Sequence, residues 1–115
     1  MNLNLSVNYR VVGPWYVRVN FGNKELEATA VNISEGGIAI ITGHNIPVSS
    51  SLELMFSLFK INRYGEVCFY NPTEITGRVR SNTVCGNNQY RLGLSFVEAE
   101  SEVNKRIGAF VRSAG

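Results

Sequence analysis

The residues best suited to chemistry lie in a short polar segment, residues 31–38, between two runs that favour β-strands. Asn32 and Ser34 place short hydrogen-bond donors and acceptors there, Gly37 permits close approach to the backbone, and Arg10 precedes the first run. The same residue types are typical of tight structural turns, in which Asn and Ser bond to nearby backbone groups. The segment by itself leaves both ligand binding and a purely structural role open.

Other chemically capable side chains do not form a convincing catalytic or metal-binding pattern. His44 is the single histidine and falls in a turn sequence, and Cys68 and Cys85 are too far apart for a Cys-x-x-Cys pair. Glu25 and Glu27 alternate along a strand, as carboxylates on a solvent-facing side do. The sequence also lacks a phosphate-binding Gly-x-x-x-x-Gly-Lys loop. We therefore expect a binding protein with no metal and no cofactor; a cysteine-based enzyme is the least favoured alternative.

Length and composition limit the function classes further. A chain of 115 residues fits one domain, and a net charge of +2 is too small to indicate binding of nucleic-acid polymers. A small barrel that binds single-stranded nucleic acid through Trp15, Tyr16, Arg18, Tyr90 and Arg91 remains a competing interpretation. No apolar run is long enough for a membrane span, and the N-terminus lacks the pattern of a signal peptide. These features predict a cytoplasmic protein.

The elements that must position the polar segment are mostly β-strands, because apolar and polar residues alternate with a period of two. The last part of the chain changes to helical spacing. We expect a flexible N-terminal segment (1–13), a barrel (14–97) and a C-terminal helix (101–112). Strands are expected over 15–21, 25–31, 37–42, 52–58, 73–80 and 89–97, with a protruding hairpin or long loop over 60–70 and a polar turn over 81–88.

The order of these features resembles the PilZ domain family. That family has an Arg-x-x-x-Arg pair near its N-terminus, followed one hairpin later by an (Asp/Asn)-x-Ser-x-x-Gly segment. Arg10 matches the second arginine, and Asn32, Ser34 and Gly37 match the later segment at each fixed position. The resemblance covers nearly the whole chain and implies a mainly β fold, a six-stranded antiparallel barrel with a C-terminal α-helix.

The resemblance also implies a function, reception of the bacterial second messenger cyclic di-GMP, with Arg10, Asn32, Ser34 and Gly37 as ligand-binding residues. This ligand is a dianion with two guanines, and an arginine can pair with its phosphate or guanine edge or stack on a purine. An arginine segment that folds over the ligand would convert binding into a change of shape.

The match departs from the family at Ser6, which occupies the position of the first arginine. A second interpretation follows: a degenerate PilZ-like domain that does not bind the nucleotide and acts through protein contacts. The aromatic and apolar segment 59–70 is a candidate surface for a protein partner or for self-association, although a core-packed strand pair is slightly favoured there.

Overall fold

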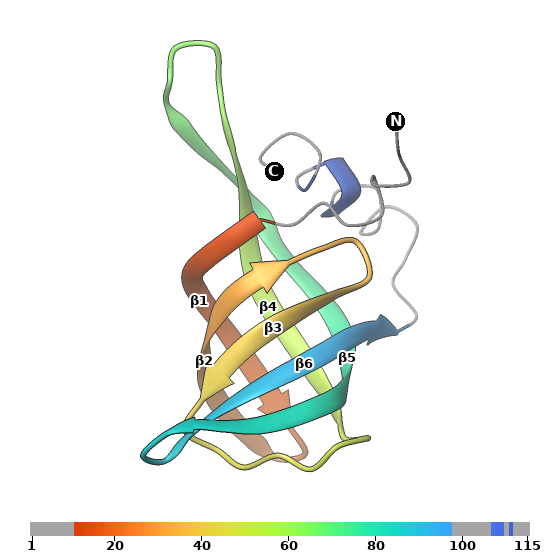
Figure 1. Cartoon of the computed structure of the whole chain (residues 1–115). Coiled ribbons are helices and arrows are strands. Elements are labelled where there is room, and N and C mark those ends of the chain that lie inside the picture. Colours follow the sequence, from red (N-terminus) through yellow and green to blue (C-terminus); the bar gives the residue numbers. More distant parts are fainter. Residues whose placement is uncertain (1–10, 98–106, 110, 112–115) are drawn as a thin grey trace, which may run out of the picture.

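The computed structural model describes residues 11–97, 107–109 and 111. Six strands form one closed barrel in the order β1-β2-β3-β6-β5-β4, and each neighbouring pair is antiparallel (Figure 1). The expected six-stranded antiparallel barrel is confirmed. The strands are β1 (Val11–Phe21), β2 (Lys24–Ile33), β3 (Gly37–Thr42), β4 (Ser51–Ile61), β5 (Val67–Gly86) and β6 (Gln89–Val97).

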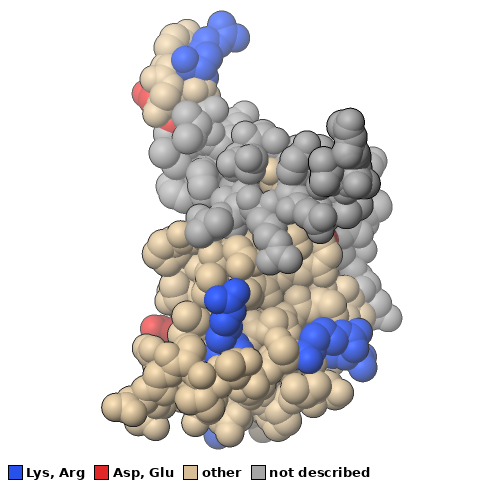
Figure 2. Space-filling view, viewed as in Figure 1, with Lys and Arg blue, Asp and Glu red and all other residues tan. Residues whose placement is uncertain are grey.

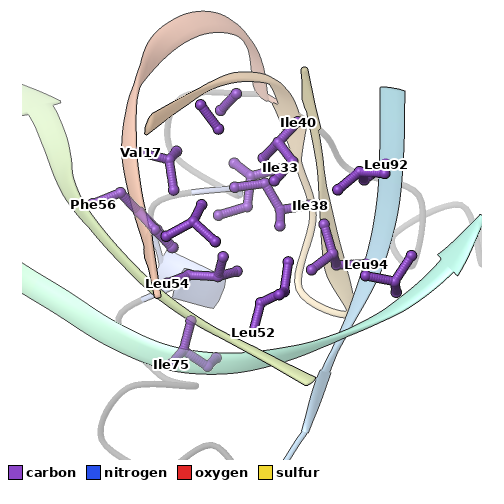
Figure 3. Packing of buried hydrophobic residues seen from close by; sticks show 14 of the residues in the cluster. Val17, Ile33, Ile38, Ile40, Leu52, Leu54, Phe56, Ile75, Leu92 and Leu94 are labelled. Carbon is purple, nitrogen blue, oxygen red and sulfur yellow. The ribbon is translucent and has the colours of Figure 1, made fainter. Parts of the chain in front are cut away.

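Alternation along the strands builds the core, because every second side chain faces the barrel interior. Figure 3 shows the aliphatic residues from different strands meeting there. Ile107 and Val111 are fully buried in the same cluster, and the described residues of the C-terminal segment are helical. They fall within the helix expected over 101–112, whose other residues lie outside the described part of the chain. This short helix lies at one end of the barrel (Figure 1).

Two boundaries differ from expectation. β1 begins at Val11, three residues before the expected barrel boundary, and the first ten residues lie outside the described part. The polar turn expected over 81–88 is wrong, since β5 continues to Gly86 and pairs Thr83 with Arg91 of β6. Polar residues persist in this strand because its outer face meets solvent and needs no apolar side chains.

The segment expected to be a hairpin or long loop is a hairpin that projects beyond the barrel, at the top of Figure 1. β4 and β5 remain paired as far as Ile61 and Val67. In the turn, Oδ1 of Asn62 accepts hydrogen bonds from the backbone N–H groups of Tyr64 and Glu66, at 2.8 and 3.0 Å. The turn is therefore built by local side-chain bonding.

Two β-bulges set which residues face outward near the polar segment. In β2 the pairing shifts between Ala30 and Asn32, so Ile33 is buried and Asn32 is on the outer face. In β5 the pairing shifts between Val79 and Ser81, and Arg80 and Ser81 are both exposed. Since a bulge adds one residue to one strand, it reverses the inward–outward alternation beyond it. Both bulges border the same outer surface.

Among the described residues, no helix has the length and apolar character needed to cross a membrane.

Candidate functional site

The turn between β2 and β3 brings together three of the four expected binding residues, Asn32, Ser34 and Gly37. The backbone N–H of Ser34 donates to the carbonyl oxygen of Gly37 at 2.9 Å, which closes the turn. The Ser34 hydroxyl is 3.5 Å from the same oxygen, a long contact that engages it only weakly. The N–H of Phe96 donates to the carbonyl of Gly36 at 2.9 Å and fastens the turn to β6.

Position 37 requires a glycine for a structural reason. It pairs with Ser95, and a Cβ at position 37 would overlap the carbonyl oxygen of Leu94. The strands β3 and β6 can therefore approach as they do only if residue 37 lacks a side chain. The glycine of the motif is therefore required by strand packing, whether or not it also allows a ligand to approach the backbone.

Next to this turn, the outside of the barrel is hollowed. Across four strands, Asn32 pairs with Ala39, Ala39 with Gly93, and Gly93 with Ser81. Because these side chains are small, they leave an open depression of about 390 Å³. We call it the outer trough; its lining is Asn32, Ser34, Gly36, Gly37, Ile38, Ala39, Arg80, Ser81, Thr83, Arg91, Gly93, Leu94 and Ser95.

Two arginines flank the floor of the outer trough. Arg91 lies two residues before Gly93 on β6, beside Thr83. Arg80 lies on the opposite side and donates from Nε to Oγ of Ser95 at 2.8 Å. Figure 2 shows basic side chains over β6 and β5 on this face. No acidic residue is among the described residues that line the trough, so it suits an anionic ligand.

The sequence also singles out Arg10 and Arg18. Arg10 lies outside the described residues, but the chain that follows it enters β1 beside the site, since Val12 pairs with Asn32. Arg18 does not line the outer trough. Its Nε lies 3.2 Å from Oε2 of Glu25, and a hydrogen bond with Tyr16, together with that carboxylate, raises the pKa of the guanidinium.

Another hollow of about 400 Å³ lies between the middle of β2, the end of β3 and the β5–β6 turn. Its lining includes Glu27 and Tyr16 but no arginine or lysine among the described residues. An anion is better accommodated in the outer trough, because there the charges are positive.

Among the described residues, no cluster of three or more His, Cys, Asp and Glu side chains could hold a metal ion. Cys85 is an exposed free thiol near the end of β5.

Sequence reasoning missed most of the β5 and β6 side of the site. The run Arg91-x-Gly93-x-Ser95 on one strand carried a usable signal, because residues two apart face the same side. Arg80 carried none, since simple alternation cannot reveal that a bulge leaves both Arg80 and Ser81 exposed.

Comparisons with known proteins support the fold and give the family of the chain. The family model described as "PilZ domain" matches residues 7–113. A search of curated protein sequences found no match.

Solved structures share the fold. The inhibitor of motility of Bacillus subtilis (MotI/DgrA) superposes with a TM-score of 0.70 at 18% identity, over 90% of this chain and 48% of that one. YcgR of Escherichia coli in complex with c-di-GMP superposes with a TM-score of 0.66 at 14% identity, over 91% and 43%. PlzA of Borreliella burgdorferi in complex with c-di-GMP gives 0.56 at 17%, over 96% and 38%. The chain thus spans half or less of these three proteins. With the family model matched over nearly its whole length, this chain belongs to the PilZ domain family, a family of regulatory cyclic di-GMP receptors.

Proposed function

We propose that this domain binds cyclic di-GMP in the outer trough and relays the binding event by a conformational change or a partner contact. Asn32 and Ser34 offer hydrogen bonds to the ligand, Gly37 holds the turn against β6, and Arg10 contacts a phosphate or a guanine. Membership of the PilZ family and the complexes of YcgR and PlzA with c-di-GMP support the choice of ligand.

The observation that carries the proposal is that the motif residues and two arginines line the same hollow. Asn32, Ser34 and Gly37 lie at one end of a depression of about 390 Å³ that also contains two arginines. This volume falls in the range of small-molecule sites, roughly 300–1,000 Å³. A cyclic dinucleotide carries two negative charges and therefore complements such a surface.

The proposed relay depends on the N-terminal segment and on the projecting hairpin. Arg10 precedes β1, so a contact between Arg10 and the ligand would couple binding to the path of the chain before the barrel. The hairpin tip exposes 78% of Tyr64, and we propose segment 59–70 as the surface for a protein partner or for self-association. A cytoplasmic location accompanies this proposal.

Calorimetric titration with cyclic di-GMP tests the proposed ligand. We expect saturable binding, and Arg10→Ala should weaken it about tenfold or more, because a hydrogen bond to a charged group is worth about 1.5–3 kcal/mol. Arg18→Ala removes the same charge from a residue already paired with Glu25 and should leave the affinity unchanged. Absence of heat at high ligand concentration would reject cyclic di-GMP as the ligand.

Ser6 favours a second candidate function, a PilZ-like domain that no longer binds the nucleotide and acts through protein contacts. A serine can neither carry charge nor stack on guanine, so half of the family's arginine pair is absent. Ser6→Arg distinguishes the two. If the wild type binds measurably and Ser6→Arg binds more tightly, the domain is a receptor that lacks one arginine of the family's pair. If binding appears only in Ser6→Arg, the degenerate domain is supported.

A further inference from the structure

The outer trough extends well beyond the motif residues, toward strands that the family motif does not include. Its floor crosses from Ala39 of β3 to Gly93 of β6 and Ser81 of β5. A Cβ on Gly93 would lie 2.6 Å from the Ser81 hydroxyl oxygen, so position 93 has no room for a side chain. The floor is therefore formed by small residues. A ligand held by Asn32 and Ser34 would therefore find an open surface continuing toward β5.

Arg91 and Arg80 stand on opposite sides of that floor. Arg91 precedes Gly93 by two residues and Ser95, the partner of Arg80, follows it by two, so all three share the outer face of β6. At the rise of an antiparallel strand, the backbones of Arg91 and Ser95 are roughly 13 Å apart. Two arginine side chains can approach a ligand between them from both sides.

The position of Arg80 is unusually well defined for an exposed arginine. It belongs to the bulge of β5, which leaves Arg80 and Ser81 both exposed and both in the trough lining. The hydrogen bond from its Nε to Ser95 uses one donor of the guanidinium. Four further N–H donors remain on the two terminal nitrogens, so the guanidinium keeps its charge and can still donate to a phosphate.

Among the described residues, no acidic side chain is found in an ion pair with Arg80 or Arg91, whereas Arg18 is paired with Glu25. The trough therefore holds two positive charges over a floor of neutral residues. Binding a dianion there would satisfy both, and each charge would be more effective than on an open surface because the hollow excludes part of the water.

From these observations we propose that Arg80 and Arg91 are ligand-binding residues that hold the phosphate groups of the cyclic dinucleotide, and so supply positive charge that Ser6 does not. The inference rests on the proposed function, because it assigns further residues to the same site. It predicts that binding depends on charge at positions 80 and 91 more than on the planar shape of the guanidinium.

Titration of the whole chain with cyclic di-GMP tests this inference. Arg91→Ala and Arg80→Ala should each weaken binding about tenfold, in line with the loss of a charge-assisted hydrogen bond. Arg91→Lys should recover most of the affinity, since a lysine binds phosphate as a point charge but cannot reproduce a bidentate or stacked contact with guanine. The affinity of each alanine variant should also fall less steeply with added salt than that of the wild type.

Arg18→Ala is the matched control here too, because it removes one exposed arginine of β1 that does not line the outer trough. It should bind as the wild type does, and unchanged circular dichroism and melting temperature should show that each variant is folded. If the wild type binds and the variants at 80 and 91 bind equally well, this inference is wrong while the proposed function stands. If Arg91→Lys is as weak as Arg91→Ala, the phosphate assignment is wrong. If the wild type does not bind, the proposed function fails and this inference fails with it.

Discussion

Nε of Arg80 donates a hydrogen bond to Oγ of Ser95 at 2.8 Å and thereby links the bulge of β5 to the neighbouring strand β6. Both residues line the outer trough, and Ser95 is also the pairing partner of Gly37 in the motif turn. The bond therefore joins the family motif to a basic residue that the motif does not contain.

This bond predicts the effect of Ser95→Ala. The variant removes the acceptor and frees the Arg80 side chain, so cyclic di-GMP should bind a few-fold to about tenfold more weakly, as expected for about 0.5–1.5 kcal/mol. Calorimetric titration measures the change. Ser57→Ala on β4, which does not line the trough, is the control. Equal affinities for the two variants would remove Ser95 from the binding account.

Gly37 and Gly36 should respond differently to alanine. A Cβ at position 37 overlaps the Leu94 carbonyl, whereas a Cβ at position 36 meets no atom within 4 Å. Gly37→Ala should lower the free energy of unfolding by about 1–3 kcal/mol, the usual cost of overpacking, and Gly36→Ala should change it little. Urea denaturation compares them. Equal stability of the two variants would show that β3 and β6 can separate to admit a side chain.

The C-terminal helix should contribute to the stability of the barrel. Ile107 is fully buried in the core cluster, so Ile107→Ala should lower the free energy of unfolding by about 2–5 kcal/mol. Val84→Ala truncates an apolar side chain that is 68% exposed and should change stability by about 0.5 kcal/mol or less. Thermal or urea unfolding that gave similar values for both would contradict the packing of this helix against the core.

Replacing two buried threonines by valine should change the stability of the protein in opposite directions. Thr73 Oγ1 has no hydrogen-bond partner among the described residues, while Thr42 Oγ1 donates to the carbonyl of Glu27 at 3.1 Å. Thr73→Val should therefore stabilise the protein by about 1 kcal/mol or more, because it removes an unsatisfied buried hydroxyl. Thr42→Val should destabilise it by about 1 kcal/mol, because the Glu27 carbonyl loses its donor. Chemical denaturation measures the free energy of unfolding of both variants. A less stable Thr73→Val or a more stable Thr42→Val would contradict this account.

Much of the fold could be predicted from the sequence because barrel strands leave a period-two pattern. The run from Trp15 to Phe21 and the run from Gln89 to Val97 both lie in strands, as expected. The pattern failed where outer-face residues are polar on a long strand: Ser81 and Thr83 were expected in a turn, yet they continue β5. Polar residues at alternating outward positions look like loop residues when no partner strand is known.

The candidate site was predictable only on its motif side. Asn32, Ser34 and Gly37 were expected together and lie together on the trough lining. Arg80 and Arg91 come from strands distant in sequence from the motif, and their approach depends on the pairing of β6 with both β3 and β5. The alternation in Arg91-x-Gly93-x-Ser95 could place Arg91 on the outer face, but the pairing of distant strands and the bulge at Arg80 are tertiary features that no local pattern reveals.

The location of the ligand is the central claim, and an amide chemical-shift titration with cyclic di-GMP tests it most directly. Gly36, Gly37 and Gly93 line the outer trough, whereas Gly22 and Gly43 lie outside it. We predict saturable shifts at the three trough glycines with small changes at Gly22 and Gly43. Shifts confined to other surfaces, or no shifts at saturating ligand, would contradict the assignment of the outer trough as the cyclic di-GMP site.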